Sequence, residues 1–389
     1  MTSPIGSSAL GDEGLSLDGA ELAEVQLWQV AVPLLVAFGA AHGTEQVRQV
    51  VLIRVVAHDG SVGYGECDAL SRPTYTHEYT SGAFALLRDE VVPALLAGAP
   101  LVHRFHPMAR AGLQTALLDG GLRRARTSLV SFLGATRRRL ERTAVLGLAT
   151  SSGSGGGPGE LLAAVAAALD GGATMVKLKV AGLSDLGTYL LVRQAFPGLD
   201  LAADANGSLA GLSGKDLVAA GLDRLGLRYL EQPYPADELL ASAALRRRCD
   251  TPVVLDESVT SLGGAQLAHA VGALDGLNVK PARLGGLGEA AALVAWAQEV
   301  GLPAFCGGML ELGVGRAAAA AVAALDGCSW PTDLGPSSAY VAHDVTEPIV
   351  TDARGWLVVP DGVGLGVSLR PDDELVPWTR RHAVVVPHR

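Results

Sequence analysis

Three acidic side chains stand at regular intervals, each at the end of a short apolar segment. They are Asp204, Glu231 and Asp256, in the motifs DAN, LEQP and LDES, and the intervals between them are 27 and 25 residues. Three carboxylates at one site repel one another unless a cation holds them, and oxygen ligands without Cys or His favour Mg²⁺ or Mn²⁺ over zinc. A helix cap or a solvated loop acid would explain one such residue. Three at matching positions indicate a metal site.

Lysine is scarce in this chain, and two of its four lysines, Lys177 and Lys179, form the sequence Lys-Leu-Lys. On a strand both side chains point to one face. Neighbouring ammonium groups and a metal dication lower the pKa of a lysine, and a neutral amine is a usable general base. Lys280, in NVKP, is expected across the same site. The alternative role of these lysines is a salt bridge with the carboxylates.

Four further polar residues are expected to support these side chains. They are Asn206, Asn278, Glu257 and Glu311. Each asparagine shares a strand face with a candidate carboxylate or lysine, and could orient it by a hydrogen bond. Alternatively, the asparagine side chains form hydrogen bonds at a strand end or in a turn. The two glutamates are the weaker candidates for a supporting role.

A period of about 25 residues organises the chain that carries these groups. Apolar runs followed by Ala/Leu-rich helical stretches are expected as strands at 144–149, 175–180, 199–205, 228–232, 252–257, 277–280 and 303–307, with a weaker eighth at 328–333. One strand and one helix per unit predict a (β/α) barrel, whose active site lies at the carboxyl ends of the strands. The fold class is therefore α/β, a modified TIM (β/α)7-8 barrel with an N-terminal α+β capping domain.

Four regions follow from the change of pattern along the chain. They are a disordered leader at 1–19, the α+β capping domain at 20–140, the barrel with the metal site at 141–345, and a C-terminal segment at 346–389 that packs back on the capping domain. Within the capping domain we expect strands at 25–32, 50–56 and 62–66, a loop at 37–45, and helices at 77–96 and 108–123. The Gly/Ser-rich stretch 151–159 lacks the Lys-Ser/Thr of a phosphate-binding loop and is expected to be a flexible loop.

Composition excludes several classes of function. The 389 residues carry a net charge of −10, which argues against nucleic acid or an anionic membrane surface as a partner. The longest apolar run has 12 residues, too few for a membrane span, and the N-terminus has no signal-peptide pattern. Four scattered cysteines without a CxxC motif suit reduced thiols in the cytoplasm.

An ordered set of motifs resembles the muconate-lactonizing subgroup of the enolase superfamily. The set is KLK at 177–179, DAN at 204–206, LEQP at 230–233, LDES at 255–258, NVKPARLGG at 278–286 and CGGMLELGVGRA at 306–317. More narrowly, the chain is similar to the o-succinylbenzoate synthase / N-acylamino acid racemase family. GYGEC at 63–67, SRPTY at 71–75, EYT at 78–80 and PDGVGLGV at 360–367 extend the likeness over about residues 22–368. It departs from the family at Leu312, where Thr is common, at the sequence of residues 330–333, and at the Gly/Ser insertion.

The resemblance implies roles for five residues. Asp204, Glu231 and Asp256 would hold Mg²⁺, with Mn²⁺ as an alternative, while Lys179 and Lys280 would act on opposite faces of a small carboxylate substrate. The enzyme would abstract the proton α to that carboxylate and form an enediolate.

Several reactions share this first step. We place dehydration to o-succinylbenzoate, a lyase reaction of menaquinone biosynthesis, first, and racemisation of an N-acylamino acid such as an N-succinylamino acid second. A muconate-type cycloisomerase and a non-catalytic homologue are further alternatives, and a sugar-acid dehydratase is disfavoured because no additional His base can be placed. A homo-oligomer is expected.

Overall fold

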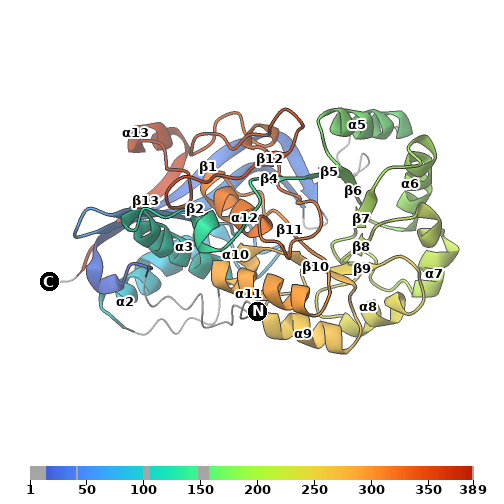
Figure 1. Cartoon of the computed structure of the whole chain (residues 1–389), viewed down its shortest axis with the longest axis horizontal. Helices are drawn as coiled ribbons and strands as arrows, with labels where there is room; N and C mark the ends of the chain where they lie inside the picture. The colour runs from blue at the N-terminus through green and yellow to red at the C-terminus, as the bar shows by residue number, and fades with distance from the viewer. Residues whose placement is uncertain (1–14, 41–42, 100–105, 148–156, 388–389) are drawn as a thin grey trace.

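The computed structural model describes residues 15–40, 43–99, 106–147 and 157–387. They form two parts that lie side by side in Figure 1. The first, here called the cap, is an antiparallel sheet in the order β13-β1-β2-β3 with its helices. The second is a parallel sheet in the order β11-β10-β9-β8-β7-β6-β5, which curls into a barrel with helices on its outer surface (Figure 1).

The cap is built from a long hairpin, a third strand and a helix that packs across them. The strands are β1 (Leu22–Ala40), β2 (Gly43–Ala57) and β3 (Val62–Cys67). The helical segments are α1 (Thr80–Leu86), a π-helical turn (Leu87–Val91), α2 (Val92–Leu96) and α3 (Pro107–Arg124). Two glycines of GYGEC allow α3 to lie against β3, because a Cβ on Gly65 would fall 1.9 Å from the carbonyl oxygen of Gly112.

Two expectations for the cap need correction. The loop expected at 37–45 is largely strand, because the pairing of β1 with β2 continues as far as Ala40 opposite Gly43. The expected disordered leader ends earlier than residue 19, since Leu17 is buried and its amide donates to the carbonyl oxygen of Leu117 at 3.1 Å. Residues 1–14 of that leader lie outside the described residues.

The barrel strands coincide with seven of the apolar runs. They are β5 (Thr143–Leu146), β6 (Met175–Lys179), β7 (Leu201–Asp204), β8 (Leu230–Glu231), β9 (Val253–Leu255), β10 (Gly276–Val279) and β11 (Ala304–Cys306). The helices between and after them are α5 (Pro158–Asp170), α6 (Leu183–Ala195), α7 (Gly214–Ala219), α8 (Leu239–Arg246), α9 (Leu262–Ala270), α10 (Pro281–Leu284), α11 (Leu287–Glu299) and α12 (Gly313–Ala323). The period of about 25 residues is therefore the strand-and-helix unit of a (β/α) barrel.

The weak eighth run is an irregular segment that joins the two edge strands of the barrel. The amide of Thr143 donates to the carbonyl oxygen of Thr332 at 2.8 Å, on the β5 side. The amide of Asp333 donates to the carbonyl oxygen of Cys306 at 3.3 Å, on the β11 side. Pro331 has no amide hydrogen to add to a ladder, which agrees with bridging contacts in place of a regular strand.

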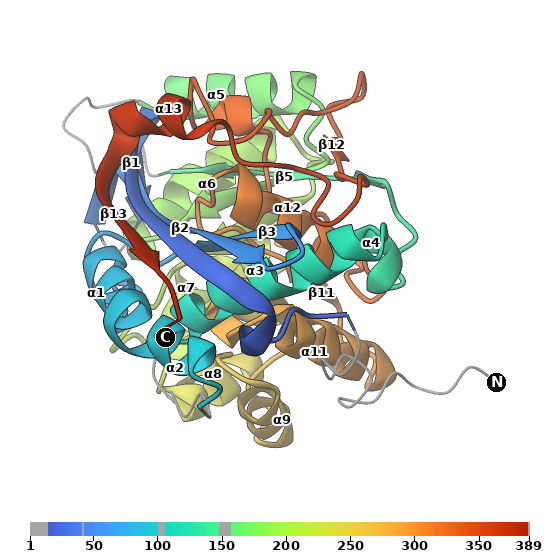
Figure 2. The same ribbon diagram turned by 90° about the vertical axis from the view of Figure 1, so that its left-hand side faces the viewer.

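The C-terminal residues return to both parts of the molecule. β13 (Thr379–Val385) pairs antiparallel with β1, and Figure 2 shows it at the edge of the cap sheet. β12 (Leu357–Val358) pairs with β4 (Arg139–Leu140), next to the start of the barrel. The remaining short helices are α4 (Leu129–Phe132) and α13 (Asp372–Leu375). Among the described residues, no helix is long and apolar enough to cross a membrane.

Candidate active site at the carboxyl ends of the barrel strands

A layer of large apolar side chains fills the barrel below the candidate residues. It contains Met175, Ala202, Tyr229, Val254 and Phe305, all fully buried, with Trp330 packed against them. The first four of these precede Lys177, Asp204, Glu231 and Asp256 by two residues each. Side chains two apart on a strand point to the same face, so the barrel directs all four polar groups inward, one layer nearer its mouth.

Lys177 is an ion-pair partner in this polar layer. It is 2% exposed, and its Nζ lies 2.6 Å from Oε2 of Glu231 and 2.5 Å from Oδ2 of Asp333. The expectation that its pKa is lowered is wrong in this arrangement. Burial does oppose the charge, but contact with Asp333 and Glu231 outweighs it and raises the pKa of Lys177.

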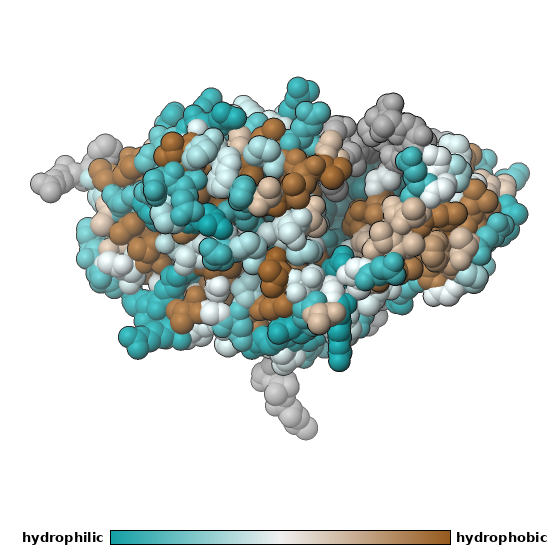
Figure 3. Space-filling view, turned by 90° about the horizontal axis from the view of Figure 1, so that it is seen from above, coloured by the Kyte–Doolittle hydropathy of each residue, from teal (hydrophilic) through white to brown (hydrophobic). Residues whose placement is uncertain are grey.

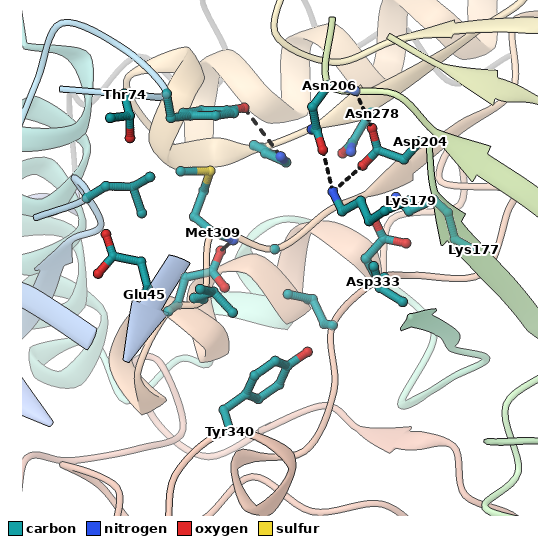
Figure 4. A pocket seen from close by; sticks show the side chains of 18 of the residues that line it. Glu45, Thr74, Lys177, Lys179, Asp204, Asn206, Asn278, Met309, Asp333 and Tyr340 are labelled. Carbon is teal, nitrogen blue, oxygen red and sulfur yellow. Dashed lines mark hydrogen bonds and ion pairs between the residues drawn. The ribbon is translucent and has the colours of Figure 1, made fainter. Parts of the chain in front are cut away.

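Lys179 is held between two oxygens at the carboxyl end of β7. Its Nζ donates to Oδ2 of Asp204 and to Oδ1 of Asn206, both at 2.6 Å, as Figure 4 shows. The amide nitrogen of Asn206 in turn donates to Glu257 at 2.9 Å. Two of the expected supporting residues therefore connect to Lys179 through one chain of hydrogen bonds.

Lys280 lies in a separate group at the ends of β9 and β10. Its Nζ is 2.8 Å from Oδ2 of Asp256 and 3.3 Å from the hydroxyl of Tyr75, which the cap contributes. The other carboxylate oxygen of Asp256 pairs with the guanidinium of Arg283, which is 2.8 Å from the same Tyr75 hydroxyl. Lys280 and Arg283 outweigh the effect of burial and lower the pKa of Asp256.

Glu231 has the least favourable environment for a charge among the three predicted metal ligands. Burial, together with the nearby charges of Asp204 and Asp256, raises its pKa to about 8 despite the opposing effect of Lys177. The amide of Asn278 donates to its Oε1 at 2.6 Å. For Asp204 the balance is reversed, because Lys179 and Lys177 outweigh burial and lower its pKa.

A cavity of about 350 Å³ opens between the cap and this end of the barrel. Lys177, Lys179, Asp204, Glu231 and Lys280 line it, whereas Asp256 is buried behind Lys280 and does not. The cap contributes Leu70, Ser71, Arg72, Thr74 and Tyr75, and the loop after β11 contributes 308–311. Figure 3 shows the hollow between the two parts, and Figure 4 shows Lys179 and Asp204 across it from Glu45.

Glu311, the fourth expected supporting residue, lies in that loop at the cavity wall. Its Oε1 accepts a hydrogen bond from the amide of Met309 at 2.7 Å. It therefore shapes the loop, and among the described residues no hydrogen bond or ion pair joins it to the lysines or to the three carboxylates.

Three residues of the site were given no role from the sequence. Asp333 ends the irregular eighth segment and pairs with Lys177, while Tyr75 and Arg283 both contact the group around Asp256. Tyr75 and Arg283 lie within motifs of the resemblance. The position of Asp333, at the carboxyl end of an apolar run, is the signal that could have identified it.

The donors at this site suit a divalent cation by their chemistry. Asp204, Glu231 and Asp256 are buried carboxylates from adjacent strands, and oxygen donors are what Mg²⁺ prefers. In the described residues their oxygens face lysines and do not converge at the spacing of a metal site. Since Asp204 and Asp256 raise the pKa of Glu231, a dication would let all three stay ionised. The chemistry of these donors therefore fits Mg²⁺, which Asp204, Glu231 and Asp256 would hold.

Comparison with known proteins places this architecture in one superfamily. A family model described as enolase C-terminal domain-like matches residues 160–373. An N-succinylamino acid racemase from Amycolatopsis sp. is 36% identical over 362 residues, covering 90% of this chain and 96% of the relative. An o-succinylbenzoate synthase from Geobacillus stearothermophilus is 34% identical over 356 residues, covering 89% and 92%.

A solved structure agrees with the sequence relatives. The structure of a probable mandelate racemase from Alicyclobacillus acidocaldarius has a TM-score of 0.83 and 36% identity, and the match covers 94% of this chain and 99% of that one. The cap, the barrel and the family match define this protein as an enolase-superfamily enzyme. Within the superfamily, the chain belongs to the family that contains o-succinylbenzoate synthases and N-succinylamino acid racemases.

Proposed function

We propose that this protein abstracts the proton α to the carboxylate of a small substrate bound in the cavity between cap and barrel. One observation carries the proposal. Two lysines from distant strands, Lys179 on β6 and Lys280 directly after β10, line the same cavity together with carboxylates at the ends of the strands between them. Such a site offers a base, a second cation and a place for a metal ion.

The residues divide the work by position. Lys179 Nζ takes the α-proton, and Asn206 holds the lysine side chain in place. Lys280 lies at the other side of the polar layer, where it stabilises negative charge on the substrate oxygens or returns a proton to the α-carbon. Mg²⁺ held by Asp204, Glu231 and Asp256 would supply additional positive charge for the enediolate.

Two outcomes follow from the same abstraction. In dehydration, Lys179 takes the α-proton and then gives it to the departing β-hydroxyl, which leaves as water and produces o-succinylbenzoate from its cyclohexadiene precursor. In racemisation, the second lysine protonates the opposite face of an N-succinylamino acid. We propose that one site serves both, with dehydration first. Racemisation is favoured by the presence of Lys280 in the cavity and by the N-succinylamino acid racemase that is 36% identical to this chain.

A panel assay tests this proposal. Purified protein with Mg²⁺ is given the o-succinylbenzoate precursor, N-succinylamino acids and N-acetylamino acids, and both product formation and α-deuterium exchange are measured. We expect dehydration of the precursor and exchange of N-succinyl substrates. If neither the precursor nor any acylamino acid shows turnover or exchange, the proposal is wrong. A variant that carries both Lys179→Ala and Lys280→Ala controls for background exchange.

Four further statements stay predictions from the sequence. They are the use of Mg²⁺ or Mn²⁺, a cytoplasmic location, a place in menaquinone biosynthesis and a homo-oligomeric state. Muconate-type cycloisomerisation would be detected as lactone formation from a muconate added to the same panel.

A further inference from the structure

The cap presents two opposite charges to the substrate cavity. Glu45, near the start of β2, and Arg72, in the segment between β3 and α1, both line it. Figure 4 shows Glu45 on the side of the cavity away from Lys179. No ion pair joins Glu45 to Arg72 within the described residues.

Most other charges that line the cavity are already engaged by the protein. Lys177, Lys179 and Lys280 pair with Asp333, Asp204 and Asp256 respectively. The remaining lining cation, Arg316, donates to the carbonyl oxygens of Gly335 and Glu311 and lies 4.4 Å from the ring centroid of Tyr340. The lysines at the catalytic end of the cavity therefore each have a carboxylate partner within the protein.

Glu45 and Arg72 differ from these groups. The carboxylate of Glu45 accepts a hydrogen bond from the hydroxyl of Ser71 at 2.8 Å, and no cation pairs with it among the described residues. The guanidinium of Arg72 has no ion pair there either, although its backbone carbonyl accepts from Thr74. The cap wall thus holds one carboxylate and one guanidinium that are available to a ligand.

The start of β2 is anchored, so this wall is in place before substrate arrives. Arg48, three residues after Glu45 on the same strand, is fully buried. Its guanidinium donates to the carbonyl oxygens of Asp68 at 2.6 Å and Leu310 at 2.9 Å. These bonds connect β2 to the segment that precedes Ser71 and to the loop after β11, which also lines the cavity.

We propose that Glu45 and Arg72 determine how the N-succinylamino acid proposed above is bound, and that the preferred substrate of this class has a cationic side chain. Glu45 binds the side-chain cation and Arg72 binds the acyl carboxylate, while the α-carboxylate goes to the catalytic end. An apolar substrate side chain would displace water from the Glu45 carboxylate without replacing the hydrogen bonds of that water, which costs free energy. A cationic side chain instead forms a charge-assisted hydrogen bond with the carboxylate. This inference rests on the racemase activity proposed above.

Matched substrates test the inference on the wild-type enzyme. N-succinylarginine and N-succinylcitrulline have nearly the same shape, but only the first carries a side-chain charge. The pair N-succinylarginine and N-butanoylarginine tests the acyl carboxylate in the same way. We expect kcat/KM for N-succinylarginine to exceed that for either neutral counterpart by about tenfold or more, as for a charge-assisted hydrogen bond.

Two variants assign the preference to residues. Glu45→Gln should remove most of the preference for arginine over citrulline, mainly by lowering kcat/KM for N-succinylarginine. Arg72→Gln should do the same for succinyl over butanoyl. Glu90→Gln and Arg247→Gln remove comparable charges from exposed positions that do not line the cavity, and should change neither ratio.

The outcomes separate this inference from the proposed function. Exchange of citrulline and arginine substrates at equal rates in the wild type would overturn the specificity proposal and leave the α-proton chemistry intact. Variants that lower all rates by one common factor would also overturn it. If no substrate exchanges its α-proton, the proposed racemase activity itself fails.

Discussion

Lys177 is nearly inaccessible to solvent and still carries a charge, because Glu231 and Asp333 both contact its ammonium group. Isolated buried charges are costly, and pairing with hydrogen bonds offsets that cost. The same holds for Asp256, which is buried between Lys280 and Arg283. At the residue scale the site is therefore a set of balanced charges, and removal of any one member leaves a buried partner uncompensated.

The two lining lysines give the sharpest prediction at this scale. If Lys179 and Lys280 flank the α-carbon, each exchanges the α-proton of only one enantiomer with solvent deuterium. Lys179→Ala should abolish exchange of one enantiomer and dehydration, while Lys280→Ala should lose exchange of the other. Loss of the charge of Lys280 should also slow dehydration by on the order of 10²-fold.

The measurement is deuterium incorporation by NMR into each pure enantiomer for each variant. Lys215→Ala, which removes a lysine from the first turn of α7, is the control and should exchange both enantiomers. Equal exchange of both enantiomers by Lys179→Ala would contradict the assignment of one face to each lysine.

Removal of the metal gives a second prediction for the same residues. Dialysis against a chelator should abolish turnover, and Mg²⁺ or Mn²⁺ should restore it, because three buried carboxylates are poorly stabilised without a dication. Thermal stability should also rise when the metal is added, since binding to the folded state alone stabilises it. Turnover by protein that elemental analysis finds free of metal would contradict the role of the cation.

At the scale of elements, carboxylates from one segment bind the amide groups at the start of a helix in another. Glu66 of β3 accepts from the amides of Leu312 and Gly315 at the N-terminus of α12, at 2.7 and 2.8 Å. Glu78 accepts from the amides of Met108 and Ala109 at the start of α3. The first helical amides have no partner within the helix, so these contacts satisfy them across the tertiary structure.

Glu78 leads to a prediction on pH and stability. Burial raises its pKa to about 7 from 4.5, although the amides of Met108 and Ala109 oppose the shift, and His106 lies 3.7 Å away. Between those pH values the folded state binds more protons than the unfolded state, so the free energy of unfolding should fall as the pH rises. This loss should be on the order of 1 to 3 kcal/mol.

Denaturant unfolding at pH 4.5 and pH 8 measures this effect against the Glu78→Gln variant, which keeps an acceptor but does not titrate. The stability of wild type relative to the variant should decrease between the two pH values. Glu90→Gln, at an exposed position, should track the wild type at both. A relative stability of Glu78→Gln that is the same at both pH values would show that Glu78 titrates normally.

At the scale of the whole molecule, the cavity exists only where cap and barrel meet. Tyr75 from the cap contacts Lys280 and Arg283 of the barrel, and Arg48 of β2 donates to the loop after β11. Buried polar contacts of this kind fix the relative position of the two parts, because a small shift would leave donors and acceptors unsatisfied.

Arg48 provides the corresponding prediction. Arg48→Met keeps much of the volume but leaves the carbonyl groups of Asp68 and Leu310 without their side-chain donor. We expect a loss of about 2 to 5 kcal/mol in the free energy of unfolding and a rise in KM, because Leu310 lines the cavity.

Arg54→Met, on the same strand, is the matched control. Arg54 pairs with the exposed Asp372, so its replacement should cost about 1 kcal/mol or less and leave KM unchanged. Equal losses for the two variants in denaturant unfolding would contradict a special role of Arg48 between cap and barrel.

The barrel and its polar layer could be predicted because their signals are local. A strand whose side chains alternate between two faces repeats about every 25 residues. The last inward-facing positions of three such strands carry Lys179, Asp204 and Glu231. The residue types and their spacing along the chain were therefore enough to identify these side chains. The motif resemblance added the family, which the relatives confirm.

Which partner each charge takes was decided only by the tertiary structure. Lys177 meets Asp333, 156 residues later, and Asp256 meets Tyr75 from the cap, 181 residues earlier. A repeat along the sequence does not predict such contacts, because they depend on how the eighth segment joins the barrel and on how the cap packs against the carboxyl ends of the barrel strands. The same dependence brings Glu45 and Arg72 into the cavity wall: their places follow from the packing of two parts whose sequences carry no common repeat.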